Sequence, residues 1–152
     1  MQDVSALFAD YASYHRTAGN KFFHRLGIPM IMLSLIGMLT QVPLLTVGTV
    51  RYDAAMILIA ASAAYYFVIE WRLALAMIAI SIAFYFIGAA IPFWINAAVF
   101  VLGWIFQFIG HKVYEHKNPA FFRNFVHLLV GPLWILNDVV HLVPQGEKRP
   151  TA

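Results

Sequence analysis

Five long apolar runs alternate with short polar clusters along this chain. The runs cover about residues 26–47, 54–69, 73–91, 93–110 and 121–143. A helix that crosses a membrane needs about 20 apolar residues, with a range of about 17–25. The first, third and fourth runs are long enough to cross. The second run is short, and the fifth is interrupted at Gly131-Pro132.

A different pattern precedes the first run. Residues 3–17 carry apolar side chains at positions 4, 7, 8, 11 and 14, with polar side chains on the opposite face. This spacing predicts an amphipathic helix that lies at the membrane interface. We expect Asp3 to cap its N-terminus, the helix to end at His15, and Gly19-Asn20 to interrupt the helical chain after it.

The composition agrees with a membrane protein. Hydrophobic residues make up 62% of the 152 residues and charged residues only 11%, whereas soluble domains carry about 25% charged residues. We therefore predict an all-α integral-membrane bundle of four to five transmembrane segments after the amphipathic helix. One domain over residues 1–152 is expected, with the interfacial helix and a polar motif at 1–25, the membrane bundle at 26–143 and a polar tail at 144–152.

Charge and cysteine content narrow the classes of function. The net charge is +3, and the basic residues stand between the apolar runs rather than along one stripe. This placement is typical of topology signals and contacts with lipid headgroups, so we expect membrane lipid as a partner and no nucleic acid. The chain has no cysteine, which excludes disulfides, cysteine zinc sites, iron–sulfur clusters and thiol catalysis. The first apolar run begins only at Leu26, which argues against a signal peptide.

The lysines and arginines predict a multi-pass orientation. With a cytoplasmic N-terminus and a fifth run that spans, seven basic residues lie inside and three outside. If the fifth run turns back at Gly131-Pro132, the count becomes nine to one. Both alternatives place the N-terminus in the cytoplasm, at the inner membrane of a bacterium or the endoplasmic reticulum of a eukaryote.

This topology gathers most of the titratable side chains at one end of the bundle. The polar clusters that parity places at the cytoplasmic end contain His15, His24, His111, Glu115, His116 and His127. A single histidine at a helix end is usually only a residue at headgroup depth. Several that converge from distant parts of the chain indicate a site, because titratable groups near membrane depth are costly.

The spacing within this group is compatible with a metal ion. His111 and Glu115 share one helical face if the fourth helix continues past Gly110, whereas His116 is rotated away by about 140°. A break between His15 and His24 would let both reach the same point. Neutral imidazoles with a carboxylate suit Fe(II), and also zinc or manganese.

Two amides accompany these candidate ligands. Asn20 lies between His15 and His24, and Gln107 lies one helical turn before His111. Either amide could orient a ligand or bind substrate. A hydrogen bond between helices is an equally good reason for Gln107. We find no Ser-His-Asp pattern, glycine-rich phosphate loop, His-Glu-x-x-His motif or di-iron histidine cluster in the chain.

Three stretches together resemble a known family. They are "YHRTAGNKFFHRLGIP" at 14–29, with its His-x4-Asn-x3-His-x4-Pro spacing, "FQFIGHKVYEHKNPAFF" at 106–122 and "LLVGPLWIL" at 128–136. They are similar to motifs of the Fe(II)-dependent 2-hydroxy fatty acid dioxygenases, small multi-pass membrane proteins known from a yeast enzyme of the endoplasmic reticulum. The likeness covers nearly the whole chain.

The resemblance implies a site and a reaction. Its motif histidines fall on His15, His24 and His111, its acid on Glu115 and its asparagine on Asn20. These histidines and the acid would be the catalytic metal ligands for Fe(II). The implied reaction is α-oxidation: O2 decarboxylates a 2-hydroxy fatty acid oxidatively to an acid that is one carbon shorter.

The resemblance also suggests how the substrate would lie. Its acyl chain would lie between the helices, with the carboxylate at the cytoplasmic end. Arg16 or Lys112 could neutralise this carboxylate, although both residues are also explained as topology signals. His127 stands where glutamine is expected, so it is a weaker candidate ligand, and His141 falls outside the motifs.

Two other functions remain open from the sequence. The same histidines and glutamate could serve a zinc-dependent lipid hydrolase. They could also carry protons in a small membrane transporter or lipid-binding protein. Substrate chain length and the formation of a homo-oligomer are likewise left open.

Overall fold

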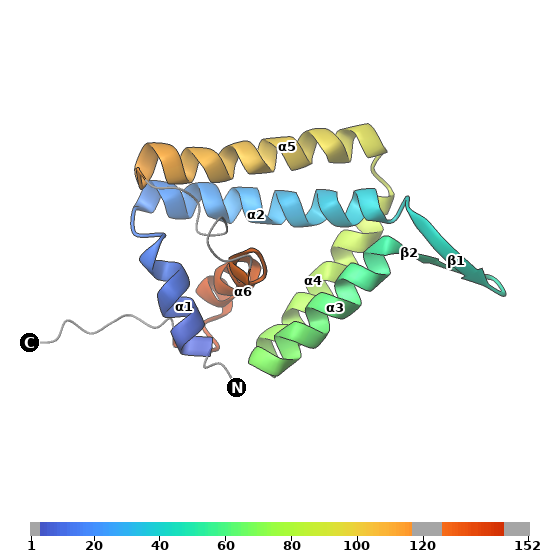
Figure 1. The fold of residues 1–152 in the computed structure, drawn as a ribbon, viewed down its shortest axis with the longest axis horizontal. Helices are drawn as coiled ribbons and strands as arrows, with labels where there is room; N and C mark the ends of the chain where they lie inside the picture. Colours follow the sequence, from blue (N-terminus) through green and yellow to red (C-terminus); the bar gives the residue numbers. More distant parts are fainter. Residues whose placement is uncertain (1–3, 117–125, 145–152) are drawn as a thin grey trace, which may run out of the picture.

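The computed structural model describes residues 4–116 and 126–144 (Figure 1). Its elements are α1 (Val4–Ser13), α2 (Ala18–Leu39), β1 (Pro43–Val47), β2 (Val50–Asp53), α3 (Ala54–Ile69), α4 (Trp71–Ala89), α5 (Phe93–Ile109), the π-helix η1 (Gly110–Tyr114) and α6 (Val126–Val140). The predictions for Asp3, for residues 117–125 and for all but the first residue of the tail at 144–152 lie outside the described residues.

Among the described residues, three helices are long and apolar enough to cross a membrane. They are α2, α4 and the continuous helix Phe93–Tyr114 that joins α5 to η1. These are the first, third and fourth apolar runs, so the prediction from run length is confirmed. The helices α3 and α6 are apolar but shorter, which agrees with the short second run and the interrupted fifth. The fold is a helical membrane bundle.

One segment of the prediction is wrong. The first apolar run does not continue as a helix to residue 47, because α2 ends at Leu39 and residues 43–53 form a β-hairpin. Strands β1 and β2 pair antiparallel, with Val47 opposite Val50 across a two-residue turn. Gly48 begins this turn with a φ of +60°, which glycine adopts without steric cost. Pro43 and the β-branched residues around it favour the strand over the helix.

The first helix also ends differently from the prediction. Helix α1 ends at Ser13, and the chain is non-helical at residues 14–17. Thr17 caps α2, because its hydroxyl accepts a hydrogen bond from the Asn20 backbone N–H at 3.3 Å. Gly19 and Asn20 therefore lie in the first turn of α2 rather than at a break. The cap at Thr17 is the stronger signal, since threonine satisfies an otherwise unpaired N–H.

The apolar face of α1 packs against α6 inside the protein. Val4, Phe8 and Tyr11 are buried there, in one cluster with Leu133 and Trp134 of α6. The predicted amphipathic helix is present, and the protein itself covers its apolar face. The sequence left open whether the fifth run spans or turns back at Gly131-Pro132. Helix α6 continues through this dipeptide, so the chain does not turn back there.

The helices α2 and α5 lie side by side and antiparallel, and α3 and α4 branch from their far end as a second pair (Figure 1). Glycines allow the close approach. A Cβ on Gly103 of α5 would lie 3.0 Å from the Gly27 carbonyl oxygen, and one on Gly88 of α4 would lie 2.7 Å from the Gly37 Cα. Small residues at such crossings let helix backbones touch. The antiparallel pair brings the start of α2 next to the end of α5.

Candidate metal centre

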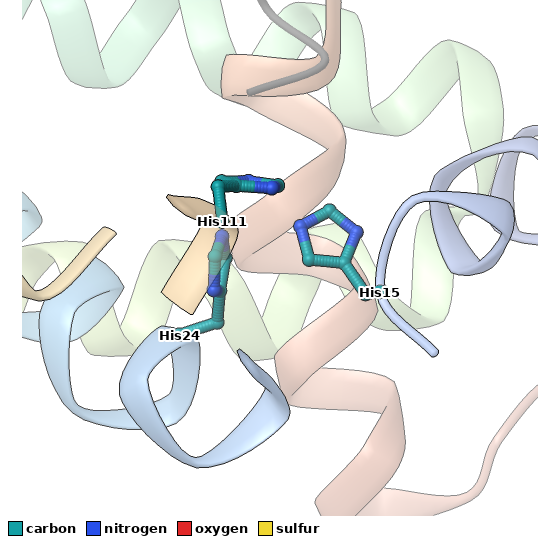
Figure 2. A group of neighbouring side chains, drawn as sticks. All are labelled: His15, His24 and His111. Carbon is teal, nitrogen blue, oxygen red and sulfur yellow. The ribbon is translucent and has the colours of Figure 1, made fainter. Parts of the chain in front are cut away.

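Three histidines from separate elements meet at this end of the bundle (Figure 2). His15 comes from the connection between α1 and α2, His24 from α2, and His111 from η1. Each offers one ring nitrogen, and these nitrogens all lie within 4.8 Å of one another. The ring centroids of His15 lie 4.4 Å from those of His24 and 4.9 Å from those of His111.

Backbone carbonyls fix which nitrogen faces the centre. His15 Nδ1 lies 2.7 Å from the Tyr11 carbonyl oxygen, and His24 Nδ1 lies 3.0 Å from that of Asn20. A carbonyl only accepts, so each Nδ1 carries the proton and each Nε2 keeps a lone pair. His15 Nε2 and His111 Nδ1 are buried without a hydrogen-bond partner. A carbonyl behind the ring is the usual support of a metal-binding histidine, so the donor set fits a metal ion.

Burial keeps this group neutral. All three histidine side chains are buried. For His15, outside the spanning helices, burial lowers the pKa to about 3, although the hydrogen bond to the Tyr11 carbonyl raises it. An imidazole with this pKa is uncharged at neutral pH, and a neutral imidazole is the form that binds a metal. Tyr11 also stacks on His15 with ring centroids 4.1 Å apart, which restrains the ring.

A glycine brings His111 to the other two histidines. A Cβ on Gly110 would lie 2.5 Å from Asn20 Oδ1 and 3.1 Å from His24 Nδ1. A larger residue would push the Asn20 and His24 side chains aside, so the glycine favours this close approach of η1 to α2. The π-helix itself is a common device at functional sites.

The structure does not place Glu115 in the histidine group. Its Oε1 accepts hydrogen bonds from the backbone N–H of Arg16 at 2.5 Å and of Thr17 at 2.7 Å, and from the Thr17 hydroxyl at 3.2 Å. Burial raises the pKa of Glu115, but these bonds and one from the Asn20 side chain leave it below its usual value. The carboxylate thus anchors the connection that carries His15. Its role as a fourth ligand stays a prediction.

The two predicted amides lie beside the histidines. Asn20 is buried, and its side-chain amide donates to the Tyr14 carbonyl at 3.2 Å. Gln107 is buried as well, and its Nε2 has no hydrogen-bond partner. Asn20 therefore braces the chain around His15 and His24, whereas Gln107 has a donor to offer to a bound molecule.

His127 of α6 lies close to the group but outside it. Its Nε2 lies 2.8 Å from Asp10 Oδ2, and its buried Nδ1 has no partner. The sequence analysis did not identify Asp10 and Tyr11 as residues of the site. Both lie on α1 beside these histidines, and this position can be recognised only when the packing of α1 against α6 is known.

The remaining candidates lie outside the buried site. Arg16, Lys112, His116 and His141 are exposed, and none of them lines the cavity described below. His116 lies beyond the end of η1 and has a φ of 53°, so its exposure comes from the end of the helix and not from the rotation expected along it. The roles of Arg16 and Lys112 in substrate binding stay predictions.

A cavity of about 390 Å³ opens from the histidines into the bundle. One end is polar, with His15, His24, His111, His127 and Gln107 in its wall. The rest is lined almost entirely by apolar side chains from α2, α3, α5 and α6. A corner of three histidines that opens into an apolar cavity suits a molecule with a polar head and a long apolar tail.

Comparisons with known proteins agree with this description. Residues 1–142 match the model of the family described as "2-hydroxy-palmitic acid dioxygenase Mpo1-like". The chain is 25% identical to the 2-hydroxy-palmitic acid dioxygenase MPO1 of Saccharomyces cerevisiae over 135 residues, which cover 88% of this chain and 78% of the yeast protein. No solved structure matches the chain. Because the family match covers nearly the whole sequence and includes all three histidines, the chain belongs to the Mpo1-like family.

Proposed function

We propose that this protein is an Fe(II)-dependent membrane dioxygenase that shortens 2-hydroxy fatty acids by one carbon. The observation that carries the proposal is the group of three histidines at the polar end of an apolar cavity. Family membership supports the substrate class, since the yeast relative is named for 2-hydroxy-palmitic acid.

The proposed reaction balances without a further reductant. The bond between the carboxyl carbon and the hydroxyl-bearing carbon breaks, the carboxyl group leaves as CO2, and the hydroxyl carbon becomes the new carboxyl group. The substrate loses four electrons, and O2 takes up these four electrons and supplies the added oxygen, with one water formed. Bound Fe(II) would supply the site at which O2 reacts, because spin-forbidden attack of O2 on an organic acid needs a redox metal or cofactor.

Each part of the site has a role in this proposal. His15, His24 and His111 hold the ion, and Glu115 keeps His15 in place or joins as a ligand. The unpartnered Nε2 of Gln107 donates a hydrogen bond to the substrate head group. This bond favours binding of a molecule with a carboxylate or hydroxyl group at that position over one with a methyl group. The apolar walls enclose the acyl chain and exclude water from the reacting end.

The test is made on protein purified without oxygen. We expect stoichiometric iron, and uptake of one O2 for each CO2 released when 2-hydroxypalmitate is added. Palmitate, which lacks the hydroxyl group, is the matched control and should consume no oxygen. Stoichiometric zinc without oxygen uptake would point to a hydrolase. Oxygen uptake that persists in metal-free protein would refute the role of Fe(II), and protein with neither stoichiometric metal nor oxygen uptake would favour a transporter or lipid-binding role.

A further inference from the structure

The cavity extends far from the histidines along one face of α2. Its wall on this helix consists of His24, Ile28, Ile31, Met32, Leu35 and Ile36. The spacing keeps all of them on one helical face. From His24 to Ile36 the helix rises about 18 Å at about 1.5 Å per residue. One leaflet of a bilayer's hydrocarbon core is about 15 Å thick, so the wall is as long as a long acyl chain.

Helices α2 and α4 touch at Gly37, directly after Ile36 at the far end of this wall. A Cβ on Gly37 would lie 2.6 Å from Asn96 Nδ2 and 2.8 Å from the Gly88 carbonyl oxygen. The two backbones therefore touch directly after Ile36, and α4 diverges from α2 beyond this contact (Figure 1). The cavity lies in the wedge between them, and we call its narrow end toward Gly37 and Gly88 the apex.

Ser81 is the α4 side chain that faces this wedge. It lines the cavity and is buried, and it lies seven residues before Gly88, on the same helical face. Leu58, in the second turn of α3, lines the cavity from the third side. Ser81 is much smaller than Ile36 and Leu58. A larger side chain at position 81 would therefore take up cavity space on the α4 side.

We propose that Ile36, Leu58 and Ser81 receive the methyl end of the acyl chain and set the length of the 2-hydroxy acid that the enzyme accepts. This inference rests on the proposed function, because the polar head must lie at the histidines for the tail to reach the apex. The length of the wall then determines how many carbons fit between the ion and the contact of Gly37 with Gly88.

The test compares two substitutions that act in opposite directions. Ser81→Leu fills the apex and should move the preferred substrate to chains at least two carbons shorter. Ile36→Ala deepens it and should move the preference to longer chains. Activity is compared as kcat/KM over 2-hydroxy acids that differ by two carbons, and each misfit should cost about tenfold or more. Ala79→Leu adds the same side chain to an exposed position on α4 and should leave the profile unchanged.

The two hypotheses can fail separately. Displacement of a fluorescent fatty acid is measured on the same variants, so chain length is also assessed without turnover. Absence of turnover with every 2-hydroxy acid refutes the proposed function, while the displacement profiles still decide the length hypothesis. A wild-type profile in folded Ser81→Leu or folded Ile36→Ala overturns the inference. Thermal unfolding shows which variant is folded, and either one alone is sufficient.

Discussion

The three central histidines are each expected to be needed for metal binding, because each offers one ring nitrogen to the group. His15→Ala, His24→Ala and His111→Ala should each reduce bound iron from stoichiometric to background levels. The helices should remain, since apolar packing holds them together. Metal analysis with circular dichroism measures both effects. The exposed His116 and His141 provide matched controls as alanine variants, and full iron content in every central variant would disprove the ligand set.

Substitution of Glu115 separates an anchoring role from a ligand role. Glu115→Ala removes the acceptor of three hydrogen bonds from Arg16 and Thr17. It should weaken metal binding about 10- to 100-fold, which is typical for groups behind a ligand. Glu115→Gln retains a side-chain oxygen and should keep most of this affinity, as a metal titration can show. Equal losses in both variants would instead support the predicted ligand role.

For the individual residues of the site, the sequence predicted which histidines converge. It did not predict the hydrogen bonds that hold them in place. The motif spacing and the parity of the apolar runs are sufficient to bring His15, His24 and His111 to one end. The position of Glu115 depends on the exact path of residues 14–17, which a cap at Thr17 determines. The contact of His127 with Asp10 joins residues far apart in sequence, and no local pattern encodes it.

Among the elements, the crossing of η1 with α2 should control the site most directly. A methyl group on Gly110 would collide with Asn20 and His24. We expect Gly110→Ala to destabilise the protein by about 1–3 kcal/mol and to weaken metal binding about tenfold or more. Chemical unfolding and metal titration measure the two effects.

Gly88→Ala is the matched control for this crossing. It introduces the same methyl group at another close helix contact, 2.7 Å from the Gly37 Cα at the far end of α2. Because backbone atoms cannot move aside as a side chain can, we expect a loss of stability at least as large and unchanged metal affinity. Equal metal affinities in the Gly110 and Gly88 variants would show that the approach of η1 does not position His111.

Helices were predicted well where the length of an apolar run alone determines the element. They were predicted less well where caps, turns or β-branched residues within a run favour another structure. The second, third and fourth apolar runs became α3, α4 and α5 with little change. The hairpin at residues 43–53 was missed because its apolar side chains extend the first run without a gap. Its own signal was the glycine of the two-residue turn between β-branched residues, which a hydropathy pattern does not register.

For the whole molecule, the predicted orientation places the metal centre in the cytoplasm and the hairpin on the other side. The hairpin projects from the end of α2 that lies away from α1 (Figure 1). Because the chain has no cysteine, single cysteines report its topology without background. In intact cells, a maleimide that cannot cross membranes should label Thr49→Cys at the hairpin turn. Arg16→Cys should be labelled only after the cells are opened, and the reverse result would invert the orientation.

The wide separation of the three histidines in sequence has a mechanical consequence. An ion held by them would close a loop of roughly ninety residues, and closing so long a loop restricts the unfolded chain. In a protein without disulfides, the ion would serve as a removable cross-link that ties α1, α2 and α5 together. The protein would then be most rigid when it is loaded and ready to react, and loss of the ion would loosen it at the end where the substrate's head group binds.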